Sequence, residues 1–219
     1  MSNAVTYDAA RRRIISMVTE GDPDAAVEAC PGWTVKDVVA HLAGGLADFT
    51  ERRLDGYEDG SWGERQVRDR RDRSMGELLV EWERNFQIAE GLFDSPVGAV
   101  LIAEIISHEH DIRTALGQPG ERDNVAVRAA LTRPLQELDK RMREQHLPAL
   151  RITLEHGDRV VGEGDPAGVL RTSSFELLRV LGGRRSDDQV RSLDWDTDPG
   201  PWLPVLPVLF GRRETALVE

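Results

Sequence analysis

The sequence predicts an α+β protein in which a helical bundle over residues 1–148 precedes a small α/β domain over residues 149–219. In the first part, apolar residues recur at helical spacing in five long segments. In the second part, short runs rich in β-branched residues flank tight turns, a pattern typical of strands. With 219 residues the chain is long enough for a medium domain and a smaller partner domain.

The bundle is expected to contain four to five helices. Their predicted ranges are about 7–20, 34–54, 75–93, 97–116 and 124–144. Thr34 and Asp37 have the spacing of a capping box, which predicts the start of the second helix. Gly117 is placed to end the fourth helix. Helices of this length joined by turns predict an up-and-down bundle whose interior is reached by side chains from facing helices.

A glycine-punctuated connection is expected between the second and third helices. It contains five arginines, and acidic residues interleave them. The arginines are Arg65, Arg68, Arg70, Arg71 and Arg73. No aromatic platform accompanies this cluster, and the whole chain has a formal net charge of -11, which repels phosphate backbones. We therefore interpret the segment as a solvated connection and expect no nucleic-acid partner.

The C-terminal domain is predicted from turn and cap signals. A β-hairpin is expected around His156-Gly157-Asp158, followed by a short strand over 168–171. Ser173 or Ser174 can cap a helix that ends near Gly182, and Ser186 with Gln189 forms a second capping box. The proline-rich tail predicts turns and at most a brief helix.

The cysteine content and the lack of long apolar segments predict where in the cell the protein is located. Cys30 is the only cysteine, so no intramolecular disulfide and no cysteine-rich zinc framework can form. No stretch of about 18 apolar residues occurs, which argues against a membrane span. The first thirty residues have no apolar signal-peptide core. These features predict a cytoplasmic protein without a membrane partner.

The predicted fourth helix carries the strongest chemical signal. Its apolar residues point in nearly every direction, so Glu104 has no polar face on which to be solvated. Glu104 and His108 are four residues apart and therefore lie one above the other on the helix. A buried carboxylate is costly unless it is paired, and a shared metal ion is one way to keep it charged.

His41 is the best candidate for a third ligand, because it lies in the apolar run Val38–Leu42 of the facing helix. Two imidazoles and one carboxylate leave positions open on zinc or iron(II), which is typical of a catalytic metal site. The plainer interpretation remains open: His41 can be an ordinary core histidine, Glu104 and His108 a surface pair, and the two helices need never bring them together. Asp111 fits equally well as an orienting residue for His108 and as an exposed aspartate.

Three segments resemble the mycothiol-dependent maleylpyruvate isomerase family, part of the wider DinB-like metalloenzymes. They are Cys30-Pro-Gly-Trp-Thr-Val-Lys-Asp-Val-Val-Ala-His-Leu42, Ala103-Glu-Ile-Ile-Ser-His-Glu-His-Asp-Ile112 and the C-terminal motif from Gly183 to Gln189. The resemblance implies a DinB-like bundle in which His41, Glu104 and His108 are the metal ligands. It further implies zinc as the ion and mycothiol, the low-molecular-weight thiol of actinobacteria, as the co-substrate.

The resemblance predicts an enzyme in which a metal-bound thiolate attacks a small electrophilic substrate, as an isomerase or a thiol transferase. Two alternatives remain open, a metal-dependent hydrolase that activates water and a non-enzymatic protein that binds a metal or a ligand. Trp33 is expected in the core, and Cys30 is expected to be inert. The sequence does not identify catalytic residues, the substrate or the oligomeric state.

Overall fold

The computed structural model describes residues 2–57, 60–209 and 211–219. The chain divides into two compact units, Met1–Gly120 and Glu121–Glu219. No helix of the described residues is long and apolar enough to cross a membrane.

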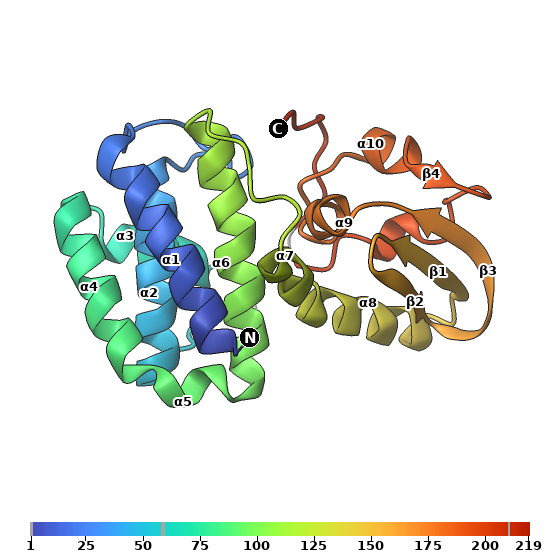
Figure 1. The fold of residues 1–219 in the computed structure, drawn as a ribbon, viewed down its shortest axis with the longest axis horizontal. Coiled ribbons are helices and arrows are strands. Elements are labelled where there is room, and N and C mark those ends of the chain that lie inside the picture. Colours follow the sequence, from blue (N-terminus) through green and yellow to red (C-terminus); the bar gives the residue numbers. More distant parts are fainter. Residues whose placement is uncertain (1, 58–59, 210) are drawn as a thin grey trace. The chain divides into compact units, whose positions relative to one another are not determined.

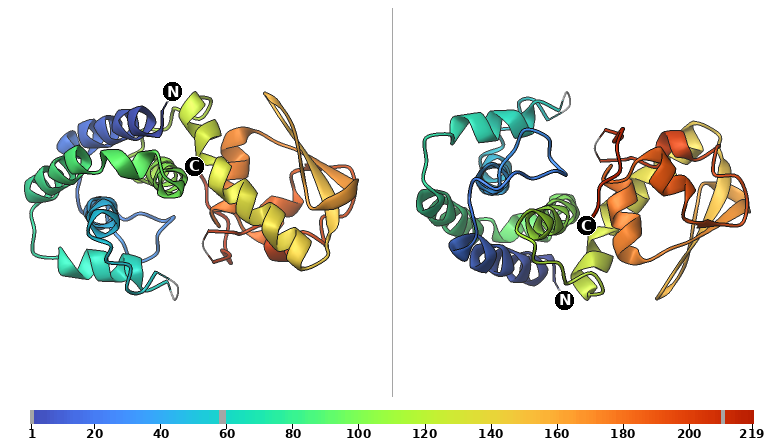
Figure 2. Two further views of the ribbon diagram at one scale, coloured as in Figure 1. Left: turned by 90° about the horizontal axis from the view of Figure 1, so that it is seen from below. Right: turned by 90° about the horizontal axis from the view of Figure 1, so that it is seen from above.

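The first unit is the helical bundle. Its elements are α1 (Asn3–Glu20), α2 (Val35–Glu51), α3 (Trp62–Asp69), α4 (Met75–Ile88), α5 (Glu90–Phe93) and α6 (Pro96–Ala115). The long helices α1, α2, α4 and α6 run alongside one another (Figure 1). Helix α2 packs against α3, α4 and α6 and is therefore the central helix of this unit (Figure 2).

Local capping explains where these helices begin. The predicted capping box of Thr34 and Asp37 is present at the start of α2. At the start of α6, the Ser95 side chain accepts a hydrogen bond from Val97 N, and Pro96 occupies the first turn. The two helices that carry the candidate ligands therefore have fixed starting points.

The arginine-rich segment is not a solvated connection, and this prediction was wrong. Residues Trp62–Asp69 form α3, in which Trp62 and Gln66 are buried. Arg70 is also buried, because its guanidinium is paired with Glu81 of α4 at 2.8 Å. The few apolar residues of this short helix hid it from a search for hydrophobic periodicity.

Two predicted long helices are each divided in the structure. The helix expected over 75–93 is interrupted at Ala89, which separates α4 from α5. The helix expected over 124–144 consists of α7 (Val125–Ala130) and α8 (Thr132–Glu144). These two helices pack on elements of the second unit, so the division of the chain falls at Gly120 and not at residue 148.

The second unit is built on a mixed four-stranded sheet with the order β2-β1-β3-β4. The strands are β1 (Pro148–Leu154), β2 (Gly157–Val161), β3 (Glu163–Arg171) and β4 (Asp194–Trp195). The predicted hairpin is confirmed, since β1 and β2 pair antiparallel with Leu154 opposite Gly157. β1 pairs parallel with β3, which in turn pairs antiparallel with β4.

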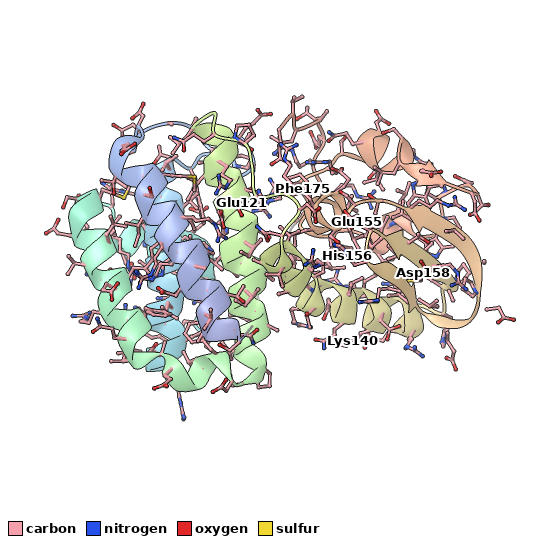
Figure 3. The ribbon with its side chains drawn as sticks, in the orientation of Figure 1. Glu121, Lys140, Glu155, His156, Asp158 and Phe175 are labelled. Atoms are coloured by element: carbon pink, nitrogen blue, oxygen red, sulfur yellow. The ribbon has the colours of Figure 1, made fainter. Side chains whose placement is uncertain are left out.

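Helices α8 and α9 (Ser174–Leu181) lie on one face of this sheet (Figure 2). Ser173, one of the two predicted cap residues, caps α9. Glu155, labelled in Figure 3, accepts hydrogen bonds from the backbone N–H and the hydroxyl of Ser174, which ties the end of β1 to the start of α9. The second predicted capping box begins α10 (Asp187–Arg191), and Leu203–Val205 of the tail form the 3-10 turn η1.

Candidate metal centre

The structure brings His41, Glu104 and His108 together inside the bundle. His41 Nε2 lies 3.2 Å from Glu104 Oε2, and His108 Nε2 lies 3.5 Å from the same oxygen. One ligand atom from each of the three residues lies within 4.8 Å of the others. Three donor atoms from α2 and α6 therefore surround one point, as a metal site requires.

The three side chains are shielded from water to different degrees. The His41 and His108 side chains are 7% and 2% exposed, whereas the Glu104 side chain is 22% exposed. Burial raises the pKa of Glu104, but hydrogen bonds from His108 and His41 outweigh it and hold that pKa well below its ordinary value. Burial lowers the pKa of His108, but contacts with Asp111, Cys30 and Glu104 raise it well above its ordinary value. Glu104 is therefore a carboxylate at neutral pH.

The second ring nitrogen of each histidine has its own partner. His41 Nδ1 lies 2.7 Å from Gln66 Oε1, and His108 Nδ1 lies 3.0 Å from Asp111 Oδ2. An amide oxygen and a carboxylate oxygen only accept hydrogen bonds, so both Nδ1 atoms must carry the hydrogen. Both histidines therefore direct Nε2 toward Glu104, with a carboxylate or amide behind the ring, as in metal-ligating histidines.

Two adjacent glycines in α2 let α3 approach this site closely. A Cβ on Gly44 would lie 2.7 Å from Arg70 Nη1, and a Cβ on Gly45 would lie 3.3 Å from Trp62 Cη2. The close approach places the Trp62 ring edge-on against His41, with centroids 5.9 Å apart. The glycine pair within an apolar helix is the sequence signal for this contact.

A small hollow lies beside the candidate ligands. It has room for about one water-sized group. Its lining residues are Tyr7, His41, Leu42, Gly45, Leu46, Phe49, Trp62, Leu101 and Glu104. Trp62 Nε1 is buried without a hydrogen-bond partner among the described residues. Tyr7 accepts a hydrogen bond from Trp82 Nε1 at 2.9 Å. The hollow is therefore apolar apart from His41, Glu104 and these two aromatic groups.

Three residues near the ligands differ from the simplest expectation. Asp111 is buried and contacts His108, which selects the orienting role over that of an exposed aspartate. Cys30, expected to be inert, lies 3.9 Å from His108 Nδ1 and 3.6 Å from Asp111 Oδ2. Trp33, expected in the core, is only half-buried and lies against the His41 ring with centroids 5.2 Å apart.

Fold and site together define a class: a helical-bundle protein with a His-Glu-His cluster inside the bundle and an α/β unit after it. Residues 6–90 match the family of the mycothiol maleylpyruvate isomerase N-terminal domain. This match agrees with the resemblance of the Cys30–Leu42 motif, and the matched segment contains His41 but not the α6 residues.

Two crystal structures share the fold over almost the whole chain. One is of the mycothiol-dependent maleylpyruvate isomerase, with a TM-score of 0.60, 13% sequence identity, and coverage of 90% of this chain and 92% of that chain. The other is of a histidine-to-alanine mutant of that enzyme, with a TM-score of 0.58, 13% identity and the same coverage. No curated protein sequence matches the chain. The predicted α+β architecture is thereby confirmed.

Proposed function

We propose that this chain is a mycothiol-dependent metalloenzyme that joins the thiol to a small electrophilic substrate, as an isomerase or a thiol transferase. His41, Glu104 and His108 hold one divalent ion, zinc, in this proposal. Mycothiol and the electrophile are its small-molecule partners. The single cysteine and the use of a low-molecular-weight thiol favour the cytoplasm as its location.

One observation carries the proposal: three electron-pair donors face one another in a buried site. Because the Nδ1 atoms are committed to Gln66 and Asp111, each Nε2 presents a lone pair to the Glu104 carboxylate whenever its ring is neutral. Lone pairs at such distances repel unless a cation, either a proton or a metal ion, lies between them. Nitrogen and oxygen ligands of this number suit zinc with open positions left for other molecules.

An ion held there supplies Lewis acidity, which lowers the pKa of a thiol that reaches an open position. The chain's own residues then have distinct tasks. Glu104 would be the negatively charged ligand, and Asp111 and Gln66 hold the imidazoles in orientation. Trp62 offers its buried indole N–H to an acceptor oxygen of the electrophile, so that the apolar hollow holds one oxygen atom of the substrate.

The test is thiol-dependent turnover. Zinc-loaded protein is supplied with mycothiol and with maleylpyruvate, the substrate in the name of the matched domain family, and with other small electrophiles. We expect loss of substrate that requires the thiol and that disappears in a folded Glu104→Ala variant. Turnover without any thiol would support the hydrolase alternative, and bound zinc without turnover would support a binding protein.

A further inference from the structure

A buried chain of hydrogen bonds leads away from His41 on the side opposite Glu104. His41 Nδ1 contacts Gln66 Oε1 at 2.7 Å, and Gln66 Nε2 donates to Asp48 Oδ2 at 2.8 Å. Gln66 and Asp48 are both 0% exposed. Because both side chains are shielded from solvent, their hydrogen-bonding groups must find partners within the protein.

The Asp48 carboxylate determines which group donates and which accepts in each of these hydrogen bonds. A carboxylate only accepts hydrogen bonds, so the Gln66 atom that faces Asp48 must be the amide NH₂ group. The other end of the same planar amide, the carbonyl oxygen, then faces His41. Since that oxygen also only accepts, His41 Nδ1 must carry a hydrogen, and Nε2 is the nitrogen left to bind a metal ion.

Two arginines pair with the Asp48 carboxylate. Arg53 Nη2 lies 2.7 Å from Asp48 Oδ1, and Arg65 Nη2 lies 2.8 Å from Asp48 Oδ2. A buried carboxylate without such partners would take up a proton, and its O–H group could then reverse the bond to Gln66. The two arginines therefore keep Asp48 as the acceptor of the hydrogen bond from Gln66.

The helices bring the three members together. His41 and Asp48 are two turns apart on α2 and thus share one face, and Gln66 of α3 lies against that face. Gly44, between them, leaves room for this approach, because a Cβ there would lie 3.0 Å from Gln66 Cβ.

We propose that Gln66 and Asp48 are positioning residues that fix the His41 tautomer, so that its Nε2 is available to the metal ion. This inference rests on the proposed function. The tautomer of His108 is fixed directly by the Asp111 carboxylate, which accepts the hydrogen bond of His108 Nδ1. At His41 a neutral amide stands between the ring and the carboxylate. The charge of Asp48 is thus kept away from the ion, which Glu104 and Asp111 already balance.

The test compares two buried amides that are replaced by aliphatic side chains. Gln66→Met removes the acceptor of His41 Nδ1 with little change in shape. Asn85→Leu is the matched control, since Asn85 is a buried amide of the same unit that lies on α4 and not on the helices that carry the two histidines. Zinc affinity is measured by competition with a chelator. The exchange rate of the Nδ1–H proton is measured by NMR on protein labelled with ¹⁵N-histidine.

We expect Gln66→Met to weaken zinc binding roughly 10- to 100-fold, the usual effect of losing a partner of a ligating histidine. The Nδ1–H proton of His41 should also exchange faster, while that of His108 keeps its protection. Asn85→Leu should change neither quantity. Equal losses in both variants, or no loss in Gln66→Met, would overturn the proposal.

A double variant guards against a purely structural explanation. Gln66→Glu alone places two carboxylates in contact and should weaken the fold. Combining it with Asp48→Asn exchanges amide and carboxylate, so the His41 acceptor is restored. We expect the double variant to bind zinc more tightly than Gln66→Met. Affinity no better than that of Gln66→Met would contradict the proposal.

The same experiment separates this inference from the proposed function. If the wild-type protein does not bind zinc at all, the proposed metal site fails. The zinc-free protein still tests the hydrogen-bond chain, since Gln66 demands a hydrogen on His41 Nδ1 whether the ring is neutral or charged. Slow exchange of that proton in wild type but not in Gln66→Met would support the chain on its own, and equal exchange would refute it.

Discussion

Each unit of the protein contains a cluster of buried ionisable groups, and the two clusters are satisfied in opposite ways. In the second unit, the Glu219 carboxylate is 2% exposed and is bound by Arg179 and by Arg185 at 2.7 Å. Arg185 also pairs with Glu176 at 2.6 Å. Each charge of this cluster has an opposite charge beside it.

In the first unit, Glu104 faces two imidazole nitrogens whose rings are already oriented by other partners. The cluster of the second unit is complete within the protein, whereas that of the first unit lacks a positive charge unless a proton or a metal ion enters. The comparison shows that burial of ionisable residues alone does not identify a binding site. A binding site is indicated instead by buried hydrogen-bonding groups whose donors and acceptors do not match.

The first way to test this contrast is to break the complete cluster. Arg179→Met should lower the free energy of unfolding by about 3–5 kcal/mol, because a buried carboxylate loses its bidentate partner. Zinc content should not change. Chemical denaturation with zinc analysis measures both. Arg191→Met, at a half-exposed pair with Asp198, is the control and should cost at most about 1 kcal/mol. Loss of zinc in Arg179→Met would mean that the clusters are not independent.

The converse change is made at the metal centre. Asp111→Asn removes the carboxylate that orients His108, and we expect zinc affinity to fall roughly 10- to 100-fold. The fold should be retained, since the new amide has nearly the same shape. Competition with a chelator gives the affinity, and circular dichroism checks the fold. Unchanged affinity in a folded variant would remove Asp111 from the site.

The pH dependence of stability should differ between the zinc-free and zinc-loaded proteins. The raised pKa of His108 means that its proton stabilises the folded zinc-free protein. That contribution is complete below the ordinary pKa of about 6.5 and is lost as the pH rises through the raised value. The lowered pKa of Glu104 adds stability above its ordinary pKa of about 4.3, which is lost as the pH falls through the lowered value.

Zinc counteracts this loss of stability at high pH, because zinc binding requires deprotonated imidazoles and becomes tighter as the pH rises. Thermal unfolding at about pH 5.5 and 8.5, on either side of the ordinary histidine pKa, measures the effect. We expect the increase in Tm caused by zinc to be larger at the higher pH. An equal increase at both values would argue against histidine ligands.

The smallest expected effect concerns the hollow. Trp62→Phe removes the buried indole N–H but keeps an aromatic ring against His41. Zinc affinity should stay unchanged, while the KM for the electrophile rises if its oxygen binds there. Steady-state kinetics at saturating thiol separates the two effects. A variant with weakened zinc binding and unchanged KM would assign Trp62 to the support of His41 instead.

The sequence was sufficient to predict the two-part architecture and to select the three residues that converge. Glu104 and His108 could be paired because helical spacing of four places them together, and both lie in an apolar helix. His41 could be added because its own helix is apolar around it. The capping residues Thr34, Ser173 and Ser186 were predictable because their hydrogen bonds are local.

What the sequence did not reveal depends on contacts between distant segments. Gln66 belongs to a short polar helix that approaches α2 closely at Gly44 and Gly45. Arg70 is buried by an ion pair across helices, which composition cannot show. Cys30 reaches His108 through a turn whose path is set by the fold. In each case a tertiary contact decides the role of a polar residue.

The most direct test of the account is the metal content of the purified protein. Wild type and the variants His41→Ala, Glu104→Ala and His108→Ala are analysed alongside His156→Ala, which changes an exposed histidine of the second unit. We predict about one equivalent of zinc or a similar divalent ion in wild type and His156→Ala, as one such site holds, and its loss from the three folded site variants. An ion that cannot be loaded into wild type, or that persists in all variants, would contradict the account.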